Sequence, residues 1–125
     1  MADIILKDLS VKVLGLAFEV HNTIGPGLLE SAYEEGMVWE LKHAGVRFER
    51  QKMFELNYKG DFIGGYFADL VVEDSIILEL KAVKQLNKVM EAQLLNYLKL
   101  SGLPVGYLIN FAGLRVEWKR FVYTE

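Results

Sequence analysis

Two short apolar segments of this 125-residue chain carry the side chains best suited to chemistry. Asp69 lies in the run from Phe67 to Val72, and Glu79 and Lys81 lie in the run from Ile76 onward. Residues two apart on a strand share a face, so Glu79 and Lys81 would point the same way. Burying an isolated charge costs roughly several kcal/mol unless the charge is paired or binds a metal. The pattern therefore predicts a charged site inside a buried sheet.

The loop Glu73-Asp74-Ser75 between these runs decides whether the two acids meet. If all three residues form the loop of a hairpin, Asp69 lies directly opposite Glu79, with Cβ atoms about 5 Å apart. A two-residue turn would instead send the acids to opposite faces. Two carboxylates this close repel unless a cation lies between them or one is protonated. Oxygen ligands of this kind suit a hard divalent ion, so we expect Mg2+ or Mn2+.

Helical periodicity adds Glu30 and Gln93 to the candidate polar residues. In a helix predicted over residues 28–44, Glu30 lies in the middle of the apolar stripe of Tyr33, Met37, Leu41 and Ala44. In a helix predicted over residues 86–100, Gln93 shares a sector with Leu86, Val89, Tyr97 and Leu100. We expect both side chains to face inward, where each needs a partner.

Each of these residues also has a purely structural interpretation. Glu79 and Lys81 would form a simple salt bridge if their strand were at a sheet edge. Glu30 follows Gly27 by three residues, where a glutamate often caps a helix start. Gln93 and Tyr97 fit a hydrogen-bonded core pair, and His21 fits a satisfied core histidine better than a ligand. The coincidence of several inward polar positions favours the functional interpretation.

The remaining elements follow from periodicity and turn signals. A first helix is predicted over residues 3–21, with stop and start signals at 23–27. Residues 47–50 and 54–58 alternate like half-exposed strands, and turns are predicted at 59–61 and at Gly64-Gly65. A buried strand is predicted over 105–111 and an edge strand over 115–123. We expect one domain over residues 1–125, of the α/β (α+β) class.

Composition restricts the function classes. The net charge of −3 repels polyanions in bulk, so nucleic-acid binding would need a local basic patch or bound cations. The absence of cysteine excludes disulfides, thiolate metal sites and cysteine nucleophiles. No apolar run approaches the roughly 18 to 20 residues of a membrane span, and the first residues lack the order of a signal peptide. We therefore expect a soluble, cytoplasmic protein without a membrane partner.

Short motifs carry a resemblance over nearly the whole chain. Residues 27–33 read Gly-Leu-Leu-Glu-Ser-Ala-Tyr. The other matching segments, in chain order, are Glu19-Val20-His21, Glu40-Leu41, Tyr58-Lys59-Gly60, Asp69, Glu79-Leu80-Lys81, the segment 92–98 and Ile109-Asn110-Phe111. In order and spacing they resemble the GxxExxY proteins, which are placed in the PD-(D/E)XK nuclease superfamily. This resemblance implies a central mixed sheet flanked by helices, and metal-dependent cleavage of phosphodiester bonds.

The resemblance also implies roles for individual residues. Asp69 and Glu79 match the two acids of the superfamily motif, Lys81 its lysine, and Glu30 the acid that many members contribute from a preceding helix. Glu30, Asp69 and Glu79, with the backbone carbonyl of Leu80, would hold the metal, and Lys81 would orient or deprotonate the attacking water. Ala68 departs from the motif, which has proline before the aspartate. The supporting residues implied in this way are His21, Tyr33, Gln93 and Tyr97.

The implied substrate is nucleic acid, either DNA or RNA. Tyr66 or Phe67 would stack on bases. Basic residues that could follow the phosphates are Lys84, Lys88, Arg47, Arg50, Lys52, Lys119 and Arg120. One alternative is a nuclease-like module that binds nucleic acid or protein without cutting. Another is a structural scaffold, which would form a homo-oligomer and pair its acids with basic residues.

Overall fold

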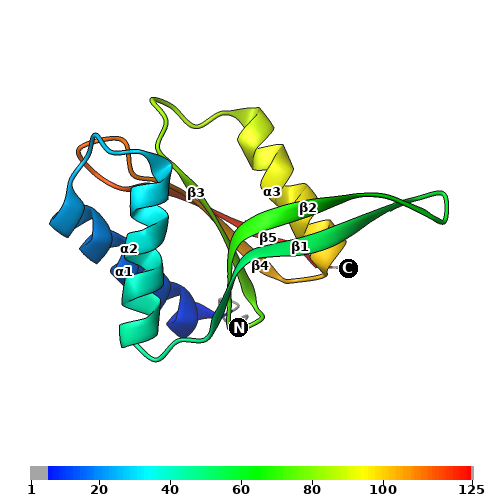
Figure 1. Cartoon of the computed structure of the whole chain (residues 1–125), viewed down its shortest axis with the longest axis horizontal. Coiled ribbons are helices and arrows are strands. Elements are labelled where there is room, and N and C mark those ends of the chain that lie inside the picture. Colours follow the sequence, from blue (N-terminus) through cyan, green and yellow to red (C-terminus); the bar gives the residue numbers. More distant parts are fainter. Residues whose placement is uncertain (1–5, 125) are drawn as a thin grey trace, which may run out of the picture.

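The computed structural model describes residues 6–124 and contains one five-stranded sheet with helices on both faces (Figure 1). The strand order is β1-β2-β3-β4-β5, with β3 and β4 parallel and the other neighbours antiparallel. A parallel pair needs a crossover, which α3 supplies between β3 and β4. The elements are α1 (Lys7–Ile24), α2 (Glu30–His43), β1 (Phe48–Tyr58), β2 (Asp61–Val72), β3 (Ile76–Lys81), α3 (Lys88–Ser101), β4 (Val105–Asn110) and β5 (Glu117–Val122). The expected α+β class with a mixed sheet is confirmed.

Two hydrophobic cores cover the two faces of the sheet. Side chains of α1 and α2 pack on one face against Leu70, Leu78 and Leu80, which are fully buried. Leu94 and Leu98 of α3 pack on the other face, around Ile77. Because β3 is covered on both faces, all its residues from Ile76 to Leu80 are buried, whichever face their side chains point to. This explains why the strand is almost wholly apolar. Figure 1 shows the helices on opposite sides of the sheet.

The helices are close to their predicted ranges, for local reasons. The helix α1 continues to Ile24 and stops at Gly25, whose φ of +79° leaves the helical region. The prediction for residues 3–5 falls outside the described residues. The helix α3 begins after Asn87, whose side-chain oxygen accepts a 2.9 Å hydrogen bond from Met90 N. Among the described helices, none has the length and apolar character needed to span a membrane.

Two predictions about the first strands are wrong. Residues 48–50 and 54–58 belong to one continuous strand, β1, because the pairing is interrupted at Gln51, whose φ is +51°, and resumes in the same register at Lys52 and Ala68. The predicted turn at Gly64-Gly65 does not exist, because both glycines lie within β2, beside an irregularity in the β1–β2 register. A Cβ on Gly65 would lie 2.6 Å from Met53 Sδ, so glycine permits a close cross-strand contact here. The turn at Lys59-Gly60 is confirmed.

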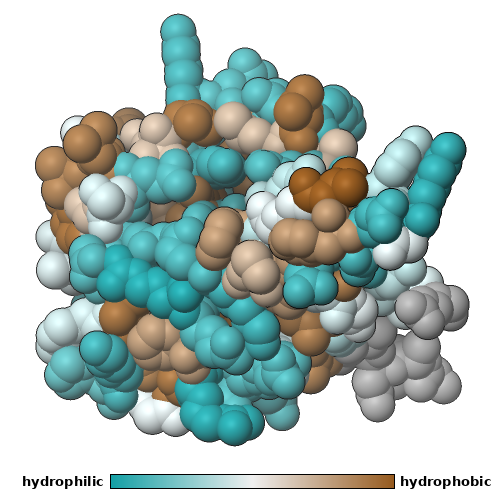
Figure 2. Space-filling model, turned by 45° about the vertical axis from the view of Figure 1, so that its right-hand side comes forward, coloured by the Kyte–Doolittle hydropathy of each residue, from teal (hydrophilic) through white to brown (hydrophobic). Residues whose placement is uncertain are grey.

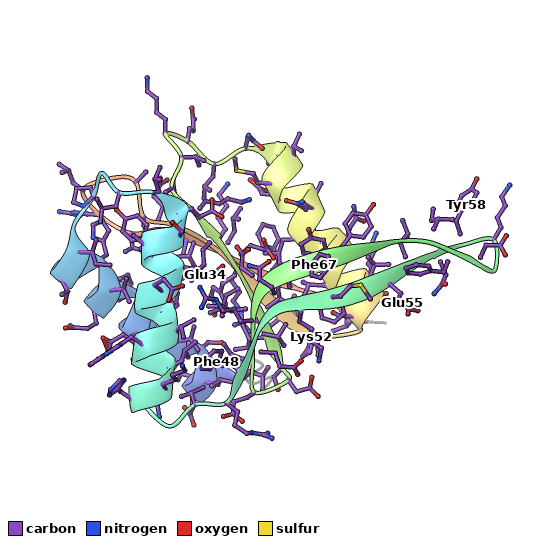
Figure 3. The ribbon with its side chains drawn as sticks, in the orientation of Figure 1. Glu34, Phe48, Lys52, Glu55, Tyr58 and Phe67 are labelled. Atoms are coloured by element: carbon purple, nitrogen blue, oxygen red, sulfur yellow. The ribbon has the colours of Figure 1, made fainter. Side chains whose placement is uncertain are left out.

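The distal part of the β1–β2 hairpin projects from the body of the molecule. Figure 1 shows this arm extending beyond the helices, and Figure 3 places Tyr58 near its far end. Exposed apolar side chains along the arm are Met53, Tyr58, Phe62, Ile63, Tyr66 and Phe67. Figure 2 shows hydrophobic surface interrupting the hydrophilic surface in several separate places. The arm therefore leaves apolar groups in water that a core would normally bury.

Candidate active site

The β2–β3 hairpin has the register that the three-residue loop predicts. Leu70 pairs with Leu78, and Val72 pairs with Ile76. Glu73 and Asp74 both adopt φ +51°, and Ser75 closes the loop by donating from its backbone N to Val72 O at 2.9 Å. This register brings Asp69 and Glu79 to the same place on neighbouring strands, which confirms the expectation that depended on it.

The two carboxylates are held by hydrogen bonds from the partner strand. Leu70 and Leu78 form the last paired position of the β2–β3 ladder. Beyond it, Asp69 N donates to Glu79 Oε1 at 3.2 Å, and Leu80 N donates to Asp69 Oδ2 at 2.8 Å. Side-chain oxygens thus replace the backbone carbonyls that would continue a regular ladder. The acids are therefore fixed by the backbone rather than by flexible contacts.

Burial makes this acid pair costly to ionise. Glu79 is only 5% exposed. Its burial, and next the charge of Asp69, raise the pKa of Glu79 to about 8. Burial also raises the pKa of Asp69, whereas the hydrogen bond from Leu80 N lowers it. A divalent cation between the two carboxylates would relieve this repulsion.

Lys81 lies on the same strand as Glu79, two residues further, and is half-buried. Its positive charge counteracts the rise in the pKa values of Asp69, Glu79 and Glu30. Within residues 6–124, neither Asp69 nor Glu79 takes part in an ion pair within 4.0 Å. Because β3 is a central strand, the interpretation of Glu79 and Lys81 as an edge salt bridge is wrong.

Glu30 differs from its prediction. It is the first residue of α2, and its side chain is exposed rather than directed into the core. Glu30 lies in the first turn of α2, at the end of the apolar stripe, where the side chain remains open to solvent. Partial burial of the carboxyl group, followed by the charge of Asp69, raises the pKa of Glu30, and Lys81 opposes this. Glu30 thus interacts electrostatically with Asp69, while its charge also complements the helix dipole.

Tyr33 holds the loop that leads into Glu30. Its buried hydroxyl donates to Gly25 O at 2.7 Å and accepts from Leu28 N at 3.2 Å. Its ring stacks on Phe111, with centroids 4.7 Å apart and planes inclined by 8°. The predicted supporting position of Tyr33 therefore corresponds to a clamp on the α1–α2 loop.

His21 is a satisfied core histidine, as its structural interpretation anticipated. It is buried, and its Nε2 lies 2.8 Å from Gly113 O. The imidazole also stacks on Phe111, with ring centroids 6.4 Å apart. It joins α1 to the loop after β4, and its contacts lie with this loop rather than with the carboxylates.

The sequence analysis missed a polar bridge from α2 to Asp69. Gln51 Nε2 donates to Glu34 Oε1 at 3.0 Å and to Asp69 Oδ1 at 3.4 Å. Arg50 Nε donates to the other oxygen of Glu34 at 2.9 Å and Arg50 also pairs with Glu35. Figure 3 shows Glu34 on the side of α2 that faces the hairpin. Glu34 lies about one helical turn after Glu30, and this spacing indicates that the two acids share one side of the helix.

A second missed residue, Asn110, fixes the chain after Lys81. Asn110 is buried at the end of β4, where it pairs with Lys81 in the parallel ladder. Its Oδ1 accepts from Val83 N at 3.0 Å, and its Nδ2 donates to Val83 O at 2.9 Å. A lone asparagine at the end of an apolar strand was the signal, since a buried amide must be hydrogen bonded.

Gln93 and Tyr97 on α3 form the predicted hydrogen-bonded pair, with Gln93 Nε2 donating to Tyr97 Oη at 3.2 Å. The expectation that Gln93 faces the core is wrong, because its side chain is exposed along a groove. The core of that face is instead filled by Leu94 and Leu98, one position further round the helix. Burial, then the charges of Glu79 and Asp69, raise the pKa of Tyr97.

Most of the basic residues expected to follow phosphates are already paired. Five of the seven form ion pairs with acidic side chains, namely Arg47, Arg50, Lys52, Lys88 and Lys119. Arg120 donates to Ser10 Oγ and Tyr107 Oη. Lys84 is exposed and, within the described chain, has no ion pair within 4.0 Å. Phosphates would therefore compete with acidic side chains for five of these seven basic residues.

The carboxylate oxygens at the site suit a hard cation, but two side chains, Asp69 and Glu79, supply them. Asp69 and Glu79 offer carboxylate oxygens, which hard divalent ions prefer. In the described part of the chain, however, no three acidic or histidine side chains are gathered closely enough to hold a metal ion. The expected convergence of Glu30 with the other two acids is therefore not found among residues 6–124, where Glu30 is exposed and interacts electrostatically with Asp69.

The mixed sheet with helices on both faces is a nuclease-like fold, and it carries the paired acids and the adjacent lysine. The family model described as the PD-(D/E)XK nuclease superfamily matches residues 7–121. The chain belongs to the PD-(D/E)XK nuclease superfamily. No curated protein matches this sequence.

Two solved structures have the same fold at low sequence identity. The crystal structure of SSO0001 is similar with a TM-score of 0.55 and 18% identity, over 94% of this chain and 57% of that chain. An alkaline exonuclease from Laribacter hongkongensis is similar with a TM-score of 0.56 and 9% identity, over 99% of this chain and 73% of that chain. This chain therefore spans little more than half of SSO0001. The expected nuclease-like fold is confirmed.

Proposed function

We propose that the protein is a Mg2+- or Mn2+-dependent nuclease that hydrolyses phosphodiester bonds of nucleic acid. The observation that carries the proposal is the acid pair, in which Asp69 and Glu79 are held side by side by hydrogen bonds from opposite strands. Both pKa values are raised by burial, so the metal-free pair is electrostatically unfavourable at neutral pH. Ionisable groups whose pKa values are strongly shifted by burial and by a neighbouring charge occur frequently at functional sites.

The side chains would divide the work as follows. Asp69 and Glu79, with Glu30 and the Leu80 carbonyl as further candidates, would hold the ion. The bound ion would polarise the scissile phosphate and stabilise the charge that develops on it. Lys81, which is in no ion pair within 4.0 Å among residues 6–124, would orient the attacking water or accept its proton. The bridge from Gln51 would keep the Asp69 carboxylate in place.

We also propose that the chain is a GxxExxY protein. The motif residues form one structural unit, since Tyr33 clamps the loop from Gly25 to Leu28 and this loop leads directly into Glu30. The spacing of the motif then has a physical reason. The tyrosine lies about one helical turn after the glutamate and fixes the helix start that carries it.

The test is cleavage of single-stranded and duplex DNA and RNA with Mg2+ or Mn2+, compared with the same reactions in a chelator. Asp69→Asn, Glu79→Gln and Lys81→Met should each abolish cleavage. Matched controls in the projecting β1–β2 arm, Asp61→Asn and Glu55→Gln, alter exposed acids and should leave cleavage intact. Cleavage that survives in all three site variants would refute the proposed site.

A non-catalytic binding module is the second candidate. The observation in its favour is that residues 6–124 gather no group of three acidic or histidine ligands. Calorimetric titration with Mn2+ separates the two, because a module of this kind has no need of the ion. Binding that is lost in Glu79→Gln would favour the nuclease.

A further inference from the structure

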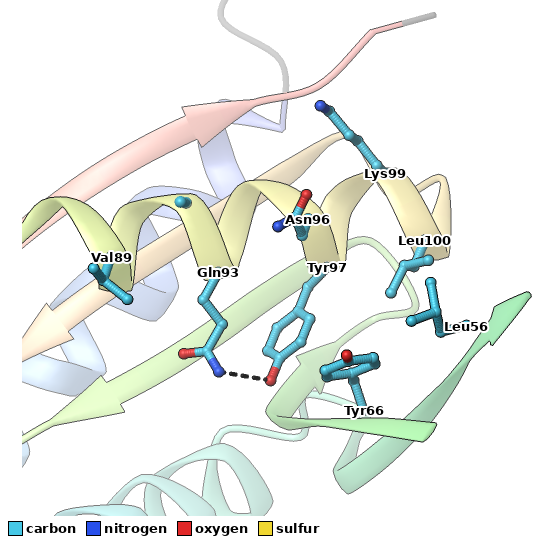
Figure 4. A pocket seen from close by; sticks show the side chains of 9 residues that line it. Leu56, Tyr66, Val89, Gln93, Asn96, Tyr97, Lys99 and Leu100 are labelled. Carbon is cyan, nitrogen blue, oxygen red and sulfur yellow. Dashed lines mark hydrogen bonds between the residues drawn. The ribbon is translucent and has the colours of Figure 1, made fainter. Parts of the chain in front are cut away.

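A groove of about 590 Å3 lies between α3 and the projecting β1–β2 arm (Figure 4). In Figure 4, side chains from one side of α3 face Tyr66 and Leu56 of the arm. The groove has a volume typical of small-molecule sites. Its lining residues are Leu56, Tyr66, Val89, Ala92, Gln93, Asn96, Tyr97, Lys99 and Leu100.

The lining is suited to a flat, uncharged ring. The Tyr66 and Tyr97 rings lie 6.0 Å apart between centroids, inclined by 54°, and aliphatic side chains complete the walls. The amides of Gln93 and Asn96 offer hydrogen-bond donors and acceptors. Lys99 is the one charged residue in this lining. Nucleobases have this combination of an apolar face and a polar edge, whereas phosphates do not.

The groove adjoins the proposed active site. Glu79 lies two residues after Ile77 on β3 and so points to the face of the sheet on which Tyr97 of α3 packs. Tyr97 also lines the groove, where its ring centroid lies 6.0 Å from that of Tyr66. A phosphate held at the acid pair would therefore have its neighbouring nucleotide within reach of Tyr66.

The charge distribution favours an unpaired strand over a duplex. A duplex is gripped mainly through its phosphates, and most candidate basic residues here are engaged with acidic side chains. Base-stacking platforms bind single strands because bases in a duplex are already stacked and paired. An aromatic groove beside an ion site, with Lys99 as the one charged residue in its lining, therefore fits a base that has left the helix.

We propose that this groove binds an unpaired nucleobase next to the scissile phosphate, so that the substrate is single-stranded or frayed nucleic acid. The proposal rests on the proposed nuclease function for the position of the phosphate. Tyr66 is the stacking residue, and Gln93 and Asn96 contact the polar edge of the base.

The test measures binding of the full chain to a labelled single-stranded oligonucleotide and to the corresponding duplex, by fluorescence anisotropy with Ca2+ in place of Mg2+. Tyr66→Ala should weaken single-strand binding by about fivefold to a hundredfold. Its matched control is Phe62→Ala, an aromatic residue of the same arm that is 58% exposed and outside the groove lining. The control should bind like the unaltered protein.

A second pair of variants covers the case in which Tyr66→Ala fails to fold. Val89 is 78% exposed in the groove, and Val11 is 63% exposed on α1, so glutamate is tolerated sterically at both. Val89→Glu places a negative charge where the base would lie and should weaken binding at least tenfold. Val11→Glu should have no effect beyond that of one added charge.

The outcomes separate this proposal from the nuclease proposal. Equal affinity for single strand and duplex, or unchanged binding in both groove variants, overturns the groove proposal even if the protein cleaves nucleic acid. Groove-dependent binding of the single strand without any cleavage supports the groove and refutes the nuclease. A change of oligomeric state in Tyr66→Ala by size-exclusion chromatography would assign the groove to a second copy of the chain and overturn the proposal.

Discussion

The end of β3 and the projecting β1–β2 arm depart from ordinary packing in opposite ways. Near the end of β3, Glu79 brings a carboxylate into an otherwise apolar interior. In the arm, apolar side chains such as Phe62 and Ile63 stay in water. Both arrangements cost free energy, the first through desolvation of charge and the second through lost burial. The two regions would therefore bind partners of opposite chemistry: a cation at the end of β3 and an apolar surface at the arm.

The largest expected effect is on catalysis at the buried acids. Asp69→Asn should lower kcat by about a thousandfold, because it removes charge that would hold the ion during phosphoryl transfer. Asp61→Asn in the arm should leave kcat unchanged, since Asp61 is exposed and remote from the pair. Steady-state kinetics with Mn2+ check the comparison. Equal losses in both variants would show that the distinction between the two regions is mistaken.

The pH dependence of stability should also arise at the acid pair. The pKa of Glu79 is raised to about 8, so between about pH 4.5 and 8 the folded state binds more protons than the unfolded state. Stability of the metal-free protein therefore falls as pH rises through this window, by a few kcal/mol at most, roughly. Denaturant unfolding at several pH values measures it. Glu79→Gln should flatten the curve, and Glu55→Gln should not.

Mn2+ should reverse this loss, because the ion competes with protons for the same oxygens. The rise in melting temperature on adding Mn2+ should therefore be larger at pH 8 than at pH 5. Thermal unfolding at fixed ion concentration checks this. An increase that is independent of pH, or that persists in Glu79→Gln, would place the ion elsewhere.

Gln51 connects the two regions and should show opposite effects on stability and activity. Its φ of +51° is strained for a residue with a Cβ, so Gln51→Gly should relieve strain worth about 1 kcal/mol. The same change removes the bridge from Glu34 to Asp69, so activity should fall about tenfold. Gln51→Ala keeps the strain and loses the bridge. A less stable Gln51→Gly variant would contradict this account.

The smallest effect is expected in the arm. Ile63→Thr changes a side chain that is exposed in water, so the free energy of unfolding should change by no more than about 0.5 kcal/mol. Urea unfolding provides the measurement. A substantial loss of stability would mean that the arm is buried in solution, for example against a second copy of the chain.

The residues also show what a sequence can and cannot reveal about such a site. The position of Asp69 opposite Glu79 was predictable on the condition that residues 73–75 all form the loop, because a two-residue turn would have sent the acids to opposite faces. The exposure of Glu30 was not, because angular position on a helix says nothing about how far the neighbouring elements extend. Gln51 was missed because its role depends on a backbone conformation that its residue type seldom adopts.

The placement of the two acids and the lysine within one hairpin has a consequence for folding. Asp69, Glu79 and Lys81 lie in a stretch of 13 residues, from 69 to 81, so their assembly closes only a short loop. Contacts of such low sequence separation form quickly and cost little chain entropy. Damage to the 73–75 loop, which sets this register, should therefore separate the carboxylates directly, whereas damage to α1 or β5 should act on them through global stability.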